Sequence, residues 1–282
     1  MSANPKKLFE LKIGLPQSTD ETLQPSVDSA TQKLYDEVYR SVVKLDADAK
    51  HHGSGFCVND SGLVATDAHV VLGAAKFRAI NSERKKFSGK LVAMDDIDDL
   101  ALVQLDGANA NDCKAVRLGS SKDVTPDQPL WGVGHPDGAD PIYVHPGYYQ
   151  RDRSMIEIVG GDTDSGKDDL DTKLAKMTPL EKSDADKFLA RTLMGVKMNV
   201  IPGDSGGPAF DSQGRVVGIM DYSNKESDAD LTRVEQLVDL LHAKSAKFKF
   251  VNTKTKDGWL LTDVSRVDGA VRPPFQDSIT GP

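Results

Sequence analysis

The sequence predicts an all-β protein with added helices, and two observations support that prediction. Between residues 53 and 135, short apolar segments follow one another with turn signals between them, as is typical of an antiparallel sandwich or barrel. One such pair, at residues 55–58 and 63–66, flanks Asn59-Asp60-Ser61-Gly62, whose turn chemistry indicates a hairpin. The sequence shows no regular alternation of strands and helices, which disfavours a parallel α/β sheet.

Three helices and ten further strands are expected along the chain. Asp28 or Ser29 caps a first helix, which carries Leu34 and Val38 at helical spacing. The other helices are expected at about 179–193, after the capping-box-like Thr178-Pro179-Leu180-Glu181, and at about 229–243. The further strands are expected at residues 41–45, 76–80, 90–94, 100–105, 129–133, 196–200, 209–210 and 215–221, and near 248–251 and 259–262.

Length and composition exclude several classes of protein. The 282 residues correspond to roughly two domains of about 150 residues, or to one β-rich domain with decorations. Lys and Arg number 35 against 43 Asp and Glu, and the net charge of −8 disfavours a nucleic-acid-binding surface. No run approaches the roughly 20 apolar residues of a membrane helix, and Glu10, Lys12 and Pro16 interrupt any signal-peptide core. The compartment stays open, with a cytoplasmic location favoured over a periplasmic or secreted one after signal removal.

The chain has two cysteines, Cys57 and Cys113. They are too few for a disulfide-stapled scaffold or a four-cysteine zinc site. They either form one disulfide or remain two unrelated buried thiols, and the second arrangement is the expectation.

The segment Pro202-Gly203-Asp204-Ser205-Gly206-Gly207-Pro208 is the most informative part of the sequence. Glycines let the backbone turn sharply and bring N–H groups close to a ligand. A serine at the centre of such a turn suits acyl transfer by an activated hydroxyl, with the backbone N–H groups of Gly203 and Ser205 converging on the developing oxyanion. Ser205 is therefore the candidate nucleophile.

A hydroxyl is a weak nucleophile unless a base removes its proton. His69 is the candidate base, because it directly follows a predicted strand in Thr66-Asp67-Ala68-His69. His135 and His145 both precede a proline and are expected in loops, and the remaining histidines lack the strand context of His69.

The imidazole in turn needs a carboxylate that fixes its tautomer and stabilises the imidazolium. Asp95, Asp96, Asp98 and Asp99 are the candidates. Asp99 is favoured because it heads the apolar strand at residues 100–103, with Asp98 as the first alternative. The other three aspartates are expected to be solvated turn residues.

The order His69, Asp99, Ser205 resembles that of the chymotrypsin-like (trypsin-like) serine proteases. Five motifs resemble in particular those of the bacterial HtrA/Deg-like members, in the expected order, at residues 53–56, 66–71, 99–102, 132–136 and 203–208. The resemblance implies a chymotrypsin-like double antiparallel β-barrel, with the active site between two six-stranded barrels.

Domain limits also follow from this resemblance. A protease domain is expected at residues 29–245, between an N-terminal arm at 1–28 and a C-terminal extension at 246–282 that is too short for the PDZ domain common in HtrA-like proteins. An acidic helical insert at about 161–192 is a lid, a partner site or a solvated decoration, the last being favoured. The possibility that the chain forms a homo-oligomer or binds a regulatory partner stays open, since HtrA-like proteins often form trimers through their N-terminal segment.

Two departures from the family pattern bear on activation and specificity. Asp204 stands where HtrA-like proteins usually carry Asn and where trypsins carry an Asp that pairs with a newly cleaved N-terminus. The stretch Ile158-Val159-Gly160-Gly161 looks like such an N-terminus, but cutting there would separate Ser205 from its partners, so it is interpreted as coincidence. The resemblance places the substrate pocket at Asn199 and Gly218. Because trypsins bind Lys or Arg with an Asp at the position of Asn199, small or medium aliphatic substrate side chains are expected instead.

The function implied by the resemblance is that of a serine endopeptidase acting on a protein or peptide substrate. Ser205, His69 and Asp99 would form the catalytic triad and work through an acyl-enzyme intermediate. No metal or organic cofactor is implied, and neither nucleic-acid binding nor membrane insertion is expected. Two alternatives stay open: a protease-fold binding or scaffold module that does not turn over substrate, and a latent protease that a partner activates.

Overall fold

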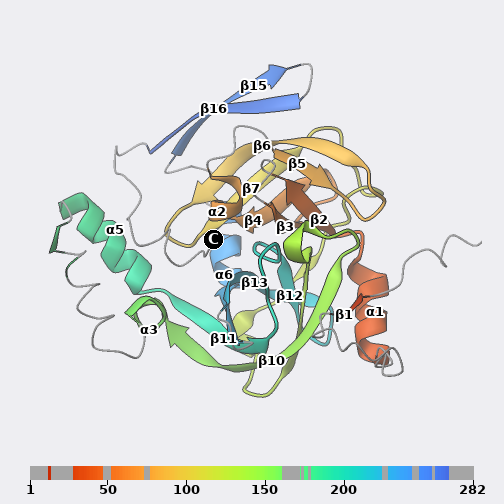
Figure 1. Cartoon of the computed structure of the whole chain (residues 1–282), viewed down its shortest axis with the longest axis horizontal. Coiled ribbons are helices and arrows are strands. Elements are labelled where there is room, and N and C mark those ends of the chain that lie inside the picture. The colour runs from red at the N-terminus through yellow and green to blue at the C-terminus, as the bar shows by residue number, and fades with distance from the viewer. Residues whose placement is uncertain are drawn as a thin grey trace, which may run out of the picture.

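The structure is a computed structural model that describes residues 12–13, 28–46, 52–72, 77–160, 172, 175–176, 179–223, 228–242, 248–255 and 258–266. Its architecture consists of two antiparallel β-barrels with helices at their margins. In the view of Figure 1 the first barrel lies above the second. Most of the N-terminal arm and the acidic part of the insert lie outside the described residues, so those predictions are not tested.

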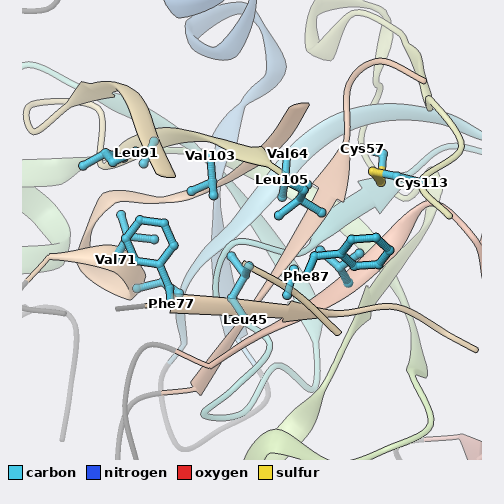
Figure 2. Packing of buried hydrophobic residues seen from close by; sticks show 14 of the residues in the cluster. Leu45, Cys57, Val64, Val71, Phe77, Phe87, Leu91, Val103, Leu105 and Cys113 are labelled. Carbon is cyan, nitrogen blue, oxygen red and sulfur yellow. A yellow bond between two sulfur atoms is a disulfide. The ribbon is translucent and has the colours of Figure 1, made fainter. Parts of the chain in front are cut away.

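The first barrel has six antiparallel strands in the closed order β2-β3-β4-β7-β6-β5. They are β2 (Val42–Asp46), β3 (His52–Cys57), β4 (Leu63–Asp67), β5 (Phe77–Ile80), β6 (Lys86–Asp95) and β7 (Leu100–Leu105). The predicted hairpin is formed by β3 and β4, and in its turn the side chain of Asn59 accepts the N–H groups of Ser61 and Leu63. Side chains such as Leu45, Phe77 and Val103 fill the interior (Figure 2).

The second barrel is also closed, in the order β9-β10-β11-β14-β13-β12, and each neighbouring pair is antiparallel. Its strands are β9 (Pro129–Gly134), β10 (Tyr143–Ser154), β11 (Thr192–Met198), β12 (Pro208–Phe210), β13 (Arg215–Ser223) and β14 (Asp228–Arg233). Two short strands, β1 (Lys12–Ile13) and β8 (Arg117–Leu118), pair in parallel with β10 and β13. The predicted all-β double barrel with added helices is thus confirmed.

The helix α1 (Ser29–Val38) covers the seam between the two barrels. As predicted, Asp28 is its N-cap, and the carboxylate accepts two backbone N–H groups of the first turn. The buried side of α1 belongs to one apolar cluster with Phe56 of β3 and Phe210 of β12. Because these residues come from different barrels, the cluster is a core shared by both.

The remaining helices are α2 (Ala68–Val71), α3 (Met155–Gly160), α5 (Pro179–Leu189) and α6 (Val234–His242), with short 3-10 turns at Ser121–Asp123 and Pro136–Gly138. The predicted strands near the C-terminus form a hairpin of β15 (Phe248–Thr255) and β16 (Gly258–Arg266), which lies beside β6 (Figure 1). Within the described ranges, none of the helices has the length and apolar character needed to cross a membrane.

Three predictions of secondary structure are wrong, and barrel closure explains each of them. His145 lies inside β10 and not in a loop. The insert helix ends at Leu189, and residues 192–198 form β11. The late helix begins at Val234, because residues 228–233 form β14. In each case pairing with neighbouring strands overrides the local sequence pattern.

Cys57 and Cys113 form a disulfide, so the expectation of two free thiols is wrong. Both residues are fully buried in the core of the first barrel (Figure 2). The carbonyl of Cys57 accepts the N–H of Val116 at 2.9 Å, so the segment after β7 runs back along β3. The two cysteines are 56 residues apart in the sequence, so no local sequence pattern indicated that they pair.

Replacing both cysteines by alanine is expected to lower the free energy of unfolding by about 4 kcal/mol, because the cross-link restricts the unfolded chain. Urea denaturation of the wild type and the double variant, each with and without a reductant, measures this effect. The reductant should destabilise the wild type and leave the variant unchanged. Equal stability of the wild type in both conditions would contradict the prediction.

Candidate active site

His69 and Asp99 lie side by side at one end of the first barrel. His69 is on α2, directly after β4, and Asp99 directly precedes β7, which pairs with β4. Nδ1 of His69 lies 2.7 Å from Oδ2 of Asp99, and the backbone N–H of His69 donates to Oδ1 at 2.9 Å. Because an ionised carboxylate only accepts, Nδ1 carries the proton in the neutral imidazole and Nε2 is the basic nitrogen.

The backbone of Asp99 is in a left-handed conformation, with φ of +53°. Such a conformation is uncommon for a residue with a Cβ atom and persists where surrounding contacts hold it. Here the carbonyl of Asp99 accepts the N–H of Ala68 at 2.9 Å. Among the alternatives, Asp98 contacts Arg191, and Asp96 is 1% exposed, so its expected solvation is wrong.

Ser205 lies in the turn between β11 and β12, on the second barrel, and is partly exposed. Gly203, with φ of +95°, and Gly206, with φ of +81°, adopt conformations that other residues rarely take. A Cβ atom at Gly206 would lie 2.2 Å from Oγ1 of Thr66, so the turn packs directly on the end of β4.

Ser54 of β3 holds the Ser205 turn from the first barrel. Its backbone N–H donates to the carbonyl of Ser205 at 2.8 Å, and its hydroxyl donates to the carbonyl of Gly203 at 2.8 Å. The same hydroxyl oxygen accepts the backbone N–H of His135, after β9, at 2.9 Å. Ser54 is completely buried, where hydrogen bonds are stronger than in water. One residue thus connects both barrels to the turn.

The same turn fixes the directions of two backbone N–H groups. The carbonyl of Pro202 accepts the N–H of Asp137 at 2.6 Å, and the carbonyl of Asp204 accepts the N–H of Gly207 at 2.9 Å. In a planar trans peptide, the carbonyl and the following N–H point in opposite directions. The N–H groups of Gly203 and Ser205 therefore point away from these bonds, and neither donates to another of the described residues.

Asp204 is paired inside the second barrel. Its Oδ2 lies 3.1 Å from Nε2 of His145 on β10, and both side chains are fully buried. The same oxygen accepts the backbone N–H of Ile201 at 3.1 Å. The residue directly before Ser205 is thus held by a partner from within the chain.

Two further carboxylates approach His69. Asp67, at the end of β4, is completely buried, and its Oδ2 lies 4.0 Å from Nδ1 of His69. One donor atom from each of Asp67, His69, Asp99 and Asp221 lies within 4.8 Å of the others. Such a set could hold a cation, but His69 is bonded to Asp99, and Asp221 accepts from Arg191 at 3.1 Å.

Burial controls the ionisation of these groups. It raises the pKa of Asp67 well above 3.8, and the neighbouring carboxylates of Asp221 and Asp99 raise it further. Burial also raises the pKa of Asp221, while the guanidinium of Arg191 opposes that shift. Burial lowers the pKa of His135 to about 3, so this histidine is neutral near pH 7.

The structure does not bring the two predicted pocket residues together: β14 separates their strands, and its register places Asn199 beyond the Asp228 end and Gly218 opposite Arg233. Asn199 is exposed just after β11. Gly218 is buried in β13, where a Cβ atom would lie 3.0 Å from the Cβ of Leu231 in the barrel core. Ile158, from the stretch that looks like a cleaved N-terminus, lies in α3, and Gly161 is outside the described residues.

The sequence matches the family model of the trypsin-like peptidase domain over residues 53–219. The chain belongs to this family. The match contains His69 and Asp99 from the first barrel and Ser205 from the second.

Relatives of this trypsin-like peptidase domain include proteins named as proteases. A probable periplasmic serine endoprotease, DegP-like, from Marinomonas sp. (strain MWYL1) is 29% identical over 167 residues, which are 59% of this chain and 29% of that protein. Protease Do-like 1, chloroplastic, from Arabidopsis thaliana is 26% identical over 219 residues, 72% of this chain and 43% of that protein. The chain therefore spans less than half the length of these two relatives.

Solved structures share the fold. The inactive form of the Rv3671c protease matches with a TM-score of 0.59 and 20% identity, over 79% of this chain and 98% of that one. An inactive serine-to-alanine mutant of Rv3671c, from M. tuberculosis H37Rv, gives a TM-score of 0.58 and 19% identity, over 78% and 94%.

Three polar residues of this trypsin-like peptidase domain were not singled out by the sequence analysis. Ser54 lies within the motif at residues 53–56 and Asp67 within that at 66–71, but neither was given a role. His145 was predicted in a loop. The sequence signal that could have identified such residues is a polar side chain within or at the end of an apolar strand. Asp67, the last residue of the apolar strand β4, is an example.

Asp67→Asn is expected to stabilise the protein at alkaline pH. Because burial raises the pKa of Asp67 in the folded state above its unfolded value, the stability that its proton contributes is fully present below about pH 4. That contribution is lost as the pH rises through the folded pKa. Thermal unfolding between pH 5 and pH 9 should show a higher Tm for the variant only at the alkaline end. The exposed Asp123→Asn is the control, and parallel Tm profiles for Asp67→Asn and the wild type would refute the prediction.

His145→Leu is expected to lower the free energy of unfolding by about 1–3 kcal/mol, because the N–H of Ile201 is then the one remaining polar contact among the described residues on Oδ2 of the buried Asp204. His145→Leu combined with Asp204→Asn should recover part of this loss, since the amide carries no charge. Urea titrations of the two single variants and the double variant form a double-mutant cycle. Additive effects would show that the two side chains are not coupled.

Proposed function

We propose that this chain is a serine endopeptidase, with Ser205 as nucleophile, His69 as base and then acid, and Asp99 as the carboxylate that orients His69. The observation that carries the proposal is the pair of hydrogen bonds from His69 to Asp99, on a barrel whose Ser54 binds the Ser205 turn. Membership of the trypsin-like peptidase family supports the reaction class, and the DegP-like relatives support protein or peptide substrates.

The proposed reaction begins with attack of the Ser205 hydroxyl on the peptide carbonyl of the substrate. His69 takes the hydroxyl proton at Nε2 and later donates it to the leaving amine, while Asp99 stabilises the imidazolium through Nδ1. The C–N bond breaks, Ser205 carries the acyl group as an ester, and water then hydrolyses that ester by the reverse sequence of proton transfers.

The oxyanion of the tetrahedral intermediate is assigned in this proposal to the N–H groups of Gly203 and Ser205. Their directions are fixed by the hydrogen bonds of the two preceding carbonyls, to Asp137 and Gly207. Donors that are already oriented need no reorganisation when charge develops, which is the main source of their effect. This arrangement supports a competent turn over a latent one.

Ser205→Ala is expected to reduce hydrolysis of casein by at least about 10³-fold and to abolish labelling by a fluorophosphonate probe, because both depend on the same hydroxyl. The exposed Ser212→Ala, seven residues further on, is the matched control and should keep both properties. Retention of casein hydrolysis by Ser205→Ala would refute the assignment.

The same probe separates the two alternatives. A folded wild-type protein that is never labelled at Ser205 would favour a binding or scaffold module without turnover. Labelling that appears only after addition of a partner or a peptide would favour a latent protease.

A further inference from the structure

We propose that Arg191, at the end of the helical insert, is a positioning residue for the His69–Asp99 pair. The proposal rests on the proposed peptidase function and concerns how its base is held. Arg191 lies between α5 and β11, and its side chain is 4% exposed. The sequence predicts a solvated decoration for this part of the chain, whereas the contacts of Arg191 lead towards the candidate active site.

The guanidinium of Arg191 binds three segments at once. Nη2 donates to Oγ1 of Thr232 at 2.7 Å, to the carbonyl of Asp98 at 3.0 Å and to Oδ2 of Asp221 at 3.1 Å. Thr232 also donates to Oδ2 of Asp221, at 2.7 Å. Since a guanidinium presents its donors in a rigid plane, these bonds fix the spacing of β13, β14 and the turn before β7.

Apolar packing holds the same turn from the same side. Ile97, two residues before Asp99, is buried in a cluster with Ala185, Phe188 and Leu189 of α5. The turn is therefore held by α2 of the first barrel on one side and by the insert on the other. This double support explains how Asp99 keeps its left-handed conformation.

The charges around His69 explain the need for a cation at this place. The carboxylates are those of Asp67 from β4, Asp98 and Asp99 from the β6–β7 turn, and Asp221 from β13, and the cation is Arg191 from the α5–β11 junction. Behind them, Asp230 of β14 pairs with Arg153 of β10 at 2.8 Å. Carboxylates this close cannot all stay ionised without a counter-charge. Through its contacts with Asp221 and Asp98, Arg191 supplies a positive charge to this group of carboxylates.

The test is the pKa of His69, followed by NMR titration of the ring signals in the Ser205→Ala background. His69→Gln identifies the signal by its loss. Arg191→Met should raise this pKa by about one unit or more, because the variant removes a positive charge that disfavours the imidazolium. Asp221→Asn should lower it, since an anion is removed and Arg191 remains. The double variant Arg191→Met with Asp221→Asn should return the pKa close to its original value.

Arg215→Met is the matched control. It breaks an ion pair of 2.7 Å with another buried carboxylate, that of Asp211 at the β12–β13 turn, and should leave the pKa of His69 unchanged. In the protein with Ser205 intact, the acidic limb of the kcat/KM profile should move in the same direction as the pKa in each variant. The kcat value should fall more than KM rises for Arg191→Met.

Two results would overturn the proposal. The first is a pKa of His69 that changes no more in Arg191→Met than in Arg215→Met. The second is an unchanged pKa of His69 in Asp221→Asn, and this second result decides the question if Arg191→Met does not fold. Because the titration needs no turnover, it reports on Arg191 even if the protein proves to have no peptidase activity. The two proposals can therefore fail separately.

Discussion

The candidate site depends on a polar contact between the two barrels that is centred on one buried serine. Ser54 belongs to the first barrel, but its backbone N–H and its hydroxyl bind the carbonyls of Ser205 and Gly203 on the second. Its carbonyl also accepts the hydroxyl of Thr66, at the end of the strand that leads to His69. A displacement of one barrel against the other would break several buried hydrogen bonds together, each with a desolvation penalty of about 1–3 kcal/mol. The relative position of base and nucleophile is therefore set by the same residue that joins the barrels.

Around this junction the protein buries more carboxyl groups than the proposed reaction needs. Asp67, Asp99 and Asp221 surround one imidazole, and Asp204 lies in the adjacent turn. Removing a carboxylate from water is unfavourable unless a cation or hydrogen bonds compensate. Asp204 lies against His145 and accepts the N–H of Ile201, and Asp221 accepts from Arg191, whereas burial raises the pKa of Asp67. Charge balance thus connects the site to β10 and to the helical insert, neither of which carries a residue of the proposed triad.

The sequence was most informative where chemistry and local geometry coincide. Gly203 and Gly206 take positive φ values in the turn around Ser205, and their place in the motif indicated that turn. The hairpin at residues 59–62 and the cap at Asp28 were recognisable for the same reason, since both depend on neighbouring residues. Features that depend on barrel closure were not recognisable. The strand β10 contains Pro146 and Gly147 and mostly polar residues, so its partners on either side define it. The disulfide and the pair of His145 with Asp204 join segments more than 50 residues apart.

The position of Arg191 follows from how unevenly stability is distributed in the fold. Among the described residues, the apolar cluster under α5 contains six that are buried, whereas that of the first barrel contains sixteen. Regions with few buried apolar contacts open at a smaller free energy than the barrel strands around them. Arg191 lies beyond the end of α5, where its carbonyl accepts the N–H of Met155 at 2.9 Å, at the point where β10 and β11 run together. The guanidinium of Arg191 binds Thr232 of β14 and Asp221 of β13, so these two partners belong to the barrel and not to the insert. The charge balance around His69 is therefore tied to strands with a larger buried apolar core than that of α5.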